Sequence, residues 1–208
     1  TKTGKWRSFL STFENVQNSK NHIFTTLCEV SPGIIWAGGY FSGLYQIDKR
    51  TSKTTYFTPA SYAHESIRPD KYIRDIRKDS RGYVWSGGYY NLKRINVQTK
   101  DIRLYHGLHS VTAIIEKDDK SMWIGTATGL FLLDIESGKY ERIQLPVEST
   151  YVYSLYQTKQ GSLYIGTSGS GVLIYDPQTK LFTHYYTGNC AMISNNIYTI
   201  LSDEDNEI

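Results

Sequence analysis

Tyrosine side chains stand directly after pairs of glycines in this sequence. Tyr40 follows the pair at 38–39, and Tyr89 and Tyr90 follow the pair at 87–88. An aromatic ring stacks on the apolar C–H face of a sugar, and nearby hydrogen-bonding groups fix its hydroxyls. The chemistry suggested by these residue types is the recognition of a polar ring-shaped ligand.

The segment that contains each glycine pair is one copy of an internal repeat. The copies are GIIWAGG at 33–39, GYVWSGG at 82–88, KSMWIGT at 120–126 and GSLYIGT at 161–167, and the tail DNEI at 205–208 begins a fifth. Successive copies are 49, 38, 41 and 45 residues apart. A repeat of about 40–45 residues is the length of a four-stranded propeller blade.

Each copy divides into four strands. An inner strand is predicted from two apolar residues, three apart, the first lying nine residues before each motif: Phe24 and Leu27, Ile73 and Ile76, Val111 and Ile114, Val152 and Leu155, Ile197 and Ile200. The second strand carries an aromatic residue predicted to pack between neighbouring blades: Trp36, Trp85, Trp123 or Tyr164. It ends at a glycine where no bulky side chain is expected to fit: Gly38, Gly87, Gly125 or Gly166. A third strand leads to a D-x-x-S/T turn, begun by Asp48, Asp134 or Asp176 and in the second copy by Asn96, before the outer strand.

These observations predict an all-β fold, a β-propeller section of four complete four-stranded blades plus partial blades at both ends, cut from a larger ring of six to eight blades. The predicted division is an outer strand of a preceding blade at 1–20, blades at 21–60, 61–107, 108–146 and 147–190, and the start of the next blade at 191–208.

The repeat resembles the two-component regulator propeller repeat, found in the extracytoplasmic sensor regions of hybrid two-component systems of Bacteroidetes. The resemblance is carried by SMWIGTATGLFLLD at 121–134, SLYIGTSGSGVLIYD at 162–176 and ISNNIYTI at 193–200. The first two copies depart from it, with Ala-Gly-Gly and Ser-Gly-Gly in place of Ile-Gly-Thr, and Asn91 replaces a glycine. The resemblance implies a periplasmic oligosaccharide sensor in an inner-membrane-anchored protein that regulates polysaccharide utilisation. It also implies that other domains of that protein, a histidine kinase among them, lie outside this chain and are its partners.

One face of a propeller carries the connections that follow the second and the fourth strand of each blade. The ligand-binding residues predicted there are Tyr40, Arg68, Tyr72, Arg74, Tyr89, Tyr90, His109, Tyr153 and Tyr198. The same face is predicted to carry Phe41, Asn91, Thr128, Tyr151, Ser168, Ser170 and Asn196. Arg68 and Arg74 would bind a sulfate or uronate group of an acidic ligand. A structural role is the alternative, with the tyrosines packed on the adjacent blade, and with Arg74 and Arg77 lining the channel or paired between blades with Asp75 or Asp79.

The sequence predicts that this chain is not an enzyme. Its turns at 78–85 and 117–123 are near relatives of the sialidase Asp-box, but no copy has the order S-x-D-x-G-x-x-W. A glycosidase needs two carboxylates across one sugar, and no such pair is placed by spacing among Glu65, Asp70 and Asp75. A quinone-dependent dehydrogenase has its tryptophan at another register. The sequence predicts no cofactor and no metal site, because no histidines have metal-ligand spacing.

A second function class stays open, an interaction or dimerisation scaffold that binds no small ligand. A ring of tyrosines around the channel mouth would favour a glycan, and a flat apolar patch on the outer strands would favour a protein. The net charge of +3 is too small to favour nucleic acid, and no contact of this segment with a membrane is predicted. Whether Cys28 and Cys190 are buried thiols or a disulfide is open, as are the glycan, the blade total and a homodimer.

Overall fold

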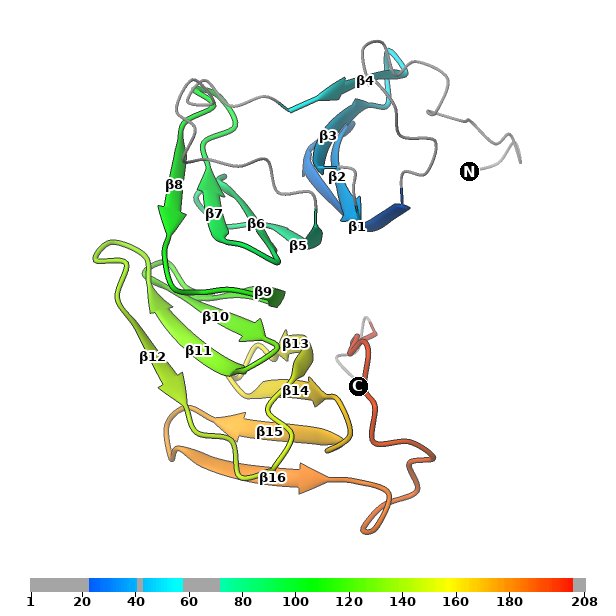
Figure 1. Ribbon diagram of the computed structural model, residues 1–208, viewed down its shortest axis with the longest axis vertical. Coiled ribbons are helices and arrows are strands. Elements are labelled where there is room, and N and C mark those ends of the chain that lie inside the picture. The colour runs from blue at the N-terminus through cyan, green and yellow to red at the C-terminus, as the bar shows by residue number, and fades with distance from the viewer. Residues whose placement is uncertain (1–22, 41–42, 58–71, 204–208) are drawn as a thin grey trace.

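The computed structural model describes residues 23–40, 43–57 and 72–203, which form four antiparallel sheets of four strands each (Figure 1). The first sheet contains β1 (Ile23–Ser31), β2 (Ile34–Tyr40), β3 (Gly43–Asp48) and β4 (Lys53–Tyr56). The second contains β5 (Ile73–Lys78), β6 (Val84–Gly88), β7 (Leu92–Ile95) and β8 (Ile102–Tyr105). The third contains β9 (Val111–Asp118), β10 (Ser121–Thr126), β11 (Gly129–Asp134) and β12 (Tyr140–Ile143). The fourth contains β13 (Val152–Gln157), β14 (Leu163–Thr167), β15 (Val172–Asp176) and β16 (Leu181–Tyr185).

The four sheets follow one another around an arc, with β1, β5, β9 and β13 on its inner side and β4, β8, β12 and β16 on its outer side (Figure 1). Within each sheet the strands lie side by side in chain order. This is the β-propeller section that the sequence predicts. The predicted strand at 1–20 lies outside the described residues. In the part of the chain that the structure describes, no helix is long and apolar enough to cross a membrane.

The core lies between the sheets. Trp36, Trp85 and Trp123 have no more than 1% of their surface exposed. Trp85 belongs to a buried cluster that also contains Val111 and Ile114 of the following sheet. Each tryptophan thus fills the space between its own sheet and the next.

The repeat glycines are required by the same packing. A Cβ atom on Gly38, Gly87 or Gly125 would overlap Ile73, Val111 or Val152, in each case the first inner-strand residue of the next sheet. A Cβ atom on Gly166 would overlap Ser154 and Ile197. Glycine at this position lets the inner strand of one sheet approach the second strand of its neighbour closely.

A β-bulge in each inner strand explains the spacing of its apolar residues. In a regular strand, residues three apart point to opposite faces. Between the two apolar residues, the pairing of the first two strands skips one residue in every sheet: Thr25, Arg74, Thr112 or Tyr153. The extra residue returns the two flanking apolar side chains to the same face.

The fourth sheet departs from the prediction. Tyr164 was expected to be a core residue, but it is only half-buried. In the described residues no further sheet covers the face on which it lies. The inner strand expected around Ile197 and Ile200 does not form within the described residues, although the Ile197 amide donates to the Thr167 carbonyl at 2.9 Å. Leu27, at the other end of the arc, is 64% exposed.

The turns before the outer strands are Asx turns. The Asp48 carboxylate accepts hydrogen bonds from the Arg50 and Thr51 amides at 2.8 and 3.2 Å, and Asp134 and Asp176 accept equivalent bonds. These bonds, with that from Thr51 first, hold the pKa of Asp48 below its usual value. The turns lie on the outer part of each sheet and do not contribute to the candidate site.

Candidate functional site

Four predicted tyrosines form a continuous group of rings across the first two sheets. The ring centroids of Tyr40 and Tyr72 are 5.9 Å apart, those of Tyr72 and Tyr89 are 6.1 Å apart, and those of Tyr89 and Tyr90 are 4.9 Å apart. Tyr89 and Tyr90 are 59% and 42% exposed, whereas Tyr40 and Tyr72 are half-buried. We call these four residues the first tyrosine group.

Three more tyrosines form a second group beside the fourth sheet. The ring centroids of Tyr151 and Tyr153 are 4.7 Å apart, and those of Tyr153 and Tyr198 are 4.8 Å apart. Tyr198 is 70% exposed, while the other two are half-buried. The second tyrosine group therefore contains two predicted binding residues, Tyr153 and Tyr198, joined to Tyr151 from the wider predicted set.

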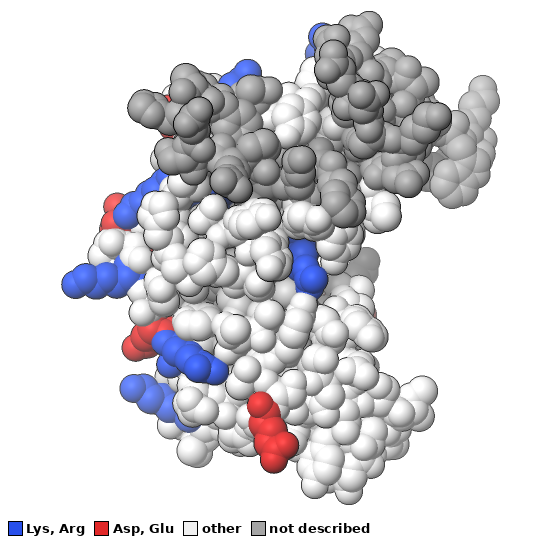
Figure 2. Space-filling view, viewed as in Figure 1, with Lys and Arg blue, Asp and Glu red and all other residues white. Residues whose placement is uncertain are grey.

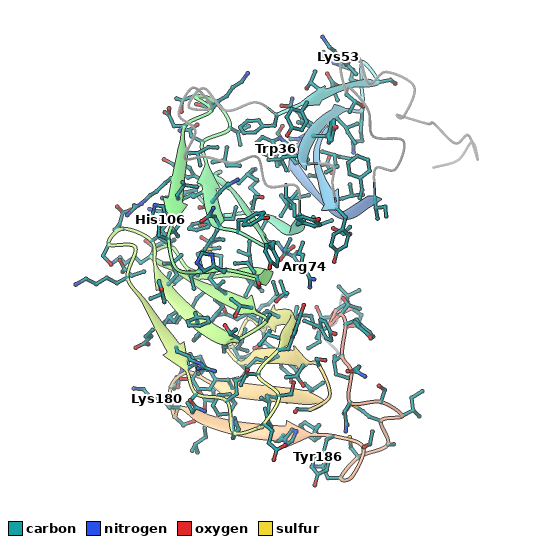
Figure 3. All side chains as sticks on the ribbon, viewed as in Figure 1. Trp36, Lys53, Arg74, His106, Lys180 and Tyr186 are labelled. Carbon is teal, nitrogen blue, oxygen red and sulfur yellow. The ribbon has the colours of Figure 1, made fainter. Side chains whose placement is uncertain are left out.

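Arg74 connects the two groups. Its Nη1 atom donates a hydrogen bond to the Tyr151 hydroxyl, and its guanidinium lies over the Tyr40 ring, 5.9 Å from the centroid. Figure 3 shows Arg74 on the inner side of the arc, between the second sheet and the C-terminal segment. The structure thus brings together residues from positions 40 to 198 around one cation.

The bulge of the inner strand explains why Arg74 and Tyr153 point into this site. Of the four bulge residues, Thr25 and Thr112 donate their hydroxyls to the carbonyls of Ile73 and Val152, in the next sheet. Arg74 and Tyr153 occupy the same position in the other two sheets, but their longer side chains extend to the tyrosines. A bulge re-aims one side chain out of the alternation of the strand. The apolar spacing of three was the signal in the sequence that could have located these positions.

Backbone hydrogen bonds hold the tyrosines in place at the strand ends. Tyr40 pairs with Tyr72 in an antiparallel bridge, and the Tyr89 amide donates to the Tyr72 carbonyl at 3.1 Å. This row of backbone hydrogen bonds continues into the third sheet at small residues. The Ser110 amide donates to the Tyr89 carbonyl at 3.0 Å, and the Ala127 amide donates to the Ser110 carbonyl at 3.0 Å. Between the two tyrosine groups, the row therefore carries Ser110 and Ala127 instead of aromatic side chains.

The remaining predicted residues are placed as follows. His109 is exposed, and its Nδ1 atom lies 2.5 Å from the Tyr90 carbonyl oxygen, beside the first tyrosine group. Arg68 lies outside the described residues. Of the alternative pairings, that of Arg77 with Asp75 is present. Asp79 pairs with Arg94, so neither carboxylate pairs with Arg74.

Asp75 follows Arg74 in β5 and is only 7% exposed. It accepts hydrogen bonds from the Ile114 amide at 2.7 Å and from Arg77 Nε at 3.3 Å. Burial raises the pKa of Asp75, although Arg77 and the Ile114 amide favour its charged form. Asp75 therefore joins the second and third sheets at an energetic cost when it is ionised.

This burial predicts a pH dependence of stability that the Asp75→Asn variant removes. Because the pKa of Asp75 is higher in the folded than in the unfolded chain, its contribution to stability decreases as the pH rises through the window between the two values. Urea unfolding of the wild type and the Asp75→Asn variant should show the variant gaining relative stability as the pH rises above about 4, the pKa of an aspartate in the unfolded chain. For Asp48→Asn the change should have the opposite sign and lie below about pH 4, where the variant loses relative stability as the pH rises, because the pKa of Asp48 is lowered in the folded chain. Equal trends in both variants would contradict the assignment.

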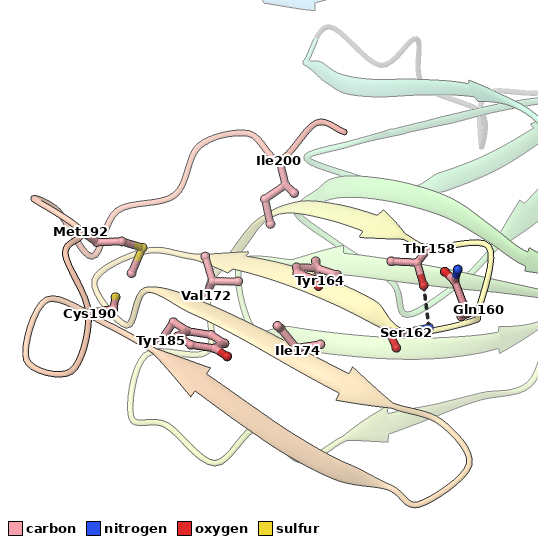
Figure 4. A pocket seen from close by; sticks show the side chains of 10 residues that line it. All are labelled: Thr158, Gln160, Ser162, Tyr164, Val172, Ile174, Tyr185, Cys190, Met192 and Ile200. Atoms are coloured by element: carbon pink, nitrogen blue, oxygen red, sulfur yellow. Dashed lines mark hydrogen bonds between the residues drawn. The ribbon is translucent and has the colours of Figure 1, made fainter. Parts of the chain in front are cut away.

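A hollow on the fourth sheet lies apart from the tyrosine groups (Figure 4). Its lining includes Tyr164, Val172, Ile174 and Met192. In the third sheet the residues equivalent to Tyr164 and Val172 are Trp123 and Leu130, and both are buried in a cluster shared with the fourth sheet. The hollow is thus the face that sheets use to pack on one another. Within the described residues there is no group of three or more His, Cys, Asp or Glu that could hold a metal ion.

Comparison with known proteins agrees with the repeat and the fold. Residues 146–169 match the model of the two component regulator propeller family. The extracellular domain of the putative hybrid two component system BT4673 from B. thetaiotaomicron superposes with a TM-score of 0.74 at 21% identity, over 94% of this chain and 26% of that one. The corresponding domain of BT3049 from the same organism gives 0.68 at 17% identity, over 82% and 25%.

Virginiamycin B lyase from Staphylococcus aureus shares the fold as well, with a TM-score of 0.70 at 14% identity over 88% of this chain and 61% of the lyase. No curated protein matches the chain closely enough to count as a relative. The chain spans about a quarter of the two extracellular-domain structures. The resemblance predicted from the sequence is confirmed, and the chain contains the two component regulator propeller repeat.

Proposed function

We propose that this chain is the ligand-sensing part of a hybrid two-component signalling protein, and that it recognises an oligosaccharide with the two tyrosine groups. The observation that carries the proposal is the joining of both groups by Arg74. The structural likeness to extracellular domains of two such systems supports a sensory role outside the cytoplasm. In this proposal the chain lies in the periplasm as part of an inner-membrane-anchored protein, and ligand binding regulates polysaccharide utilisation through its other domains.

The exposed rings are suited to a sugar. Tyr89, Tyr90 and Tyr198 each expose more than two fifths of their surface, so their faces are available for stacking. Their neighbours carry hydroxyl and guanidinium groups that can bond to sugar hydroxyls. Output then requires that the ligand bind one arrangement of the whole protein more tightly than another.

Binding without turnover is the better supported reading of this site. A glycosidase needs two carboxylates across the scissile bond. Asp75 is buried and occupied by Ile114 and Arg77, while Glu65 and Asp70 lie outside the described residues. The likeness to virginiamycin B lyase, at 14% identity, concerns the fold alone.

The distribution of exposed aromatics favours a glycan over a protein scaffold. On the described outer strands, the large hydrophobic side chains that are exposed are Tyr56 on β4, Tyr140 on β12, and Leu181 and Tyr185 on β16. They are divided among three sheets, which differs from the flat patch expected of a protein-binding surface. The tyrosines of the first group instead lie at the ends of first and second strands, and Tyr151 and Tyr153 of the second group lie at the start of β13.

Calorimetric titration of the full-length protein with a panel of neutral and acidic oligosaccharides tests the proposal. We expect saturable binding that Tyr153→Ala weakens at least tenfold, about 1.4 kcal/mol, because the variant removes the central ring of the second tyrosine group. Tyr140→Ala is the matched control, since it removes a partly exposed tyrosine from an outer strand. Binding that is unchanged by Tyr153→Ala would move the site elsewhere, and no binding to any sugar would favour the scaffold.

A further inference from the structure

The guanidinium of Arg74 has no carboxylate partner among the described residues. Its interactions are the hydrogen bond to the Tyr151 hydroxyl and the contact with the Tyr40 ring. A guanidinium has five N–H donors, of which Tyr151 accepts one. Of the acidic residues nearest to Arg74 in the sequence, Asp75 and Asp79 are buried and paired with other arginines, and Asp70 lies outside the described residues.

The surroundings of Arg74 hold this charge in a fixed position. Tyr151 is itself in contact with Tyr153, and Tyr40 is paired with Tyr72 through its backbone. In Figure 2, a basic side chain stands among uncharged atoms at the place where Figure 3 labels Arg74. A half-buried cation in an uncharged aromatic setting loses hydration without gaining a counter-ion, so an anion that enters the site supplies the missing partner.

From this arrangement we infer that the ligand carries an acidic group, a carboxylate or a sulfate ester, that binds Arg74 while its sugar rings lie on the tyrosines. This inference rests on the proposed function and narrows its ligand class. The Tyr151 hydroxyl accepts a hydrogen bond from Arg74, which leaves its own proton free to be donated to the same anion. A carboxylate or a sulfate ester presents two oxygens that can pair with a guanidinium through two parallel bonds, which distinguishes Arg from Lys at such a site.

Calorimetric titrations of the full-length protein with two matched pairs of probes test the inference. The first pair is an oligogalacturonide and its methyl ester, and the second is a keratan-type disaccharide of galactose and N-acetylglucosamine with and without its sulfate. At least one acidic probe should bind tenfold or more tightly than its neutral counterpart, and the pair that does so identifies a carboxylate or a sulfate as the acidic group. Arg74→Gln should remove that preference, weakening the acidic probe at least tenfold more than the neutral one.

Arg81→Gln is the matched control, because Arg81 is an exposed arginine in the turn between β5 and β6, at the other end of these strands, where it pairs with Glu136 at 3.4 Å. Its acidic preference should equal that of the wild type. Arg74→Lys keeps the charge but not the paired donors, so an intermediate preference is expected and would show that charge and geometry both contribute. Equal affinity for acidic and neutral probes, or a preference that survives Arg74→Gln, would overturn the inference while the proposed function stands. No binding of any saccharide would overturn both.

Discussion

Replacement of Asp79 by alanine is expected to lower the free energy of unfolding by about 3–5 kcal/mol. Asp79 is only 3% exposed, and its Oδ2 atom accepts a hydrogen bond from Trp85 Nε1 at 2.9 Å. Its Oδ1 atom accepts one from the Tyr83 amide at 2.8 Å. Arg94 Nε lies 3.5 Å from the carboxylate, and the Arg94 guanidinium stacks on the Tyr83 ring at 3.7 Å from the centroid. Removing the carboxylate leaves a buried cation and a buried indole N–H without their partner.

Urea unfolding followed by tryptophan fluorescence measures the effect of Asp79→Ala. Asp118→Ala is the control, because Asp118 lies in the corresponding turn of the third sheet and also accepts a backbone amide, from Lys120 at 3.0 Å. The Asp118 side chain is 46% exposed, so its loss should cost no more than about 1 kcal/mol. Equal losses for the two variants would show that the Asp79 network does not stabilise the second sheet.

Replacement of Trp123 by alanine is expected to destabilise the fold by about 3–5 kcal/mol. Trp123 is 1% exposed and packs between the third and fourth sheets with Leu155, Leu163 and Tyr175, whose ring centroid is 5.8 Å from its own. The substitution leaves a cavity that only a movement of one sheet toward the other could close. The cavity adds to the lost burial of the ring.

Two comparisons make the Trp123 prediction specific. Tyr164→Ala, at the equivalent position of the fourth sheet, should cost clearly less because Tyr164 is only half-buried. Trp123→Phe should cost less than Trp85→Phe, since Trp123 Nε1 has no hydrogen-bond partner among the described residues while Trp85 Nε1 donates to Asp79. Chemical denaturation of the four variants tests both orders. A loss at Tyr164→Ala as large as at Trp123→Ala would contradict the account of packing between sheets.

Much of the fold was predictable because each copy of the repeat is recognised from residues that lie close together in the sequence. A tryptophan two residues before a glycine recurs at 36, 85 and 123, and each glycine accommodates an aliphatic side chain of the next sheet. The Asx turns were equally local, since Asp48 bonds to amides two and three residues ahead. The fate of Tyr164 was not predictable from its motif, because burial depends on whether a neighbouring sheet covers it.

The candidate site shows the same division. The sequence by itself determined which residue types stand at the strand ends, because the repeat places Tyr40 and Tyr89 at one recurrent position after the glycine pair, and Tyr153 directly after the first apolar residue of an inner strand. Only the tertiary structure decided that Arg74 contacts Tyr40 and Tyr151, which lie 34 residues before it and 77 residues after it. The physical reason is that a bulge turns one side chain out of the regular alternation, and the curvature of neighbouring sheets around the arc sets which distant residues it meets.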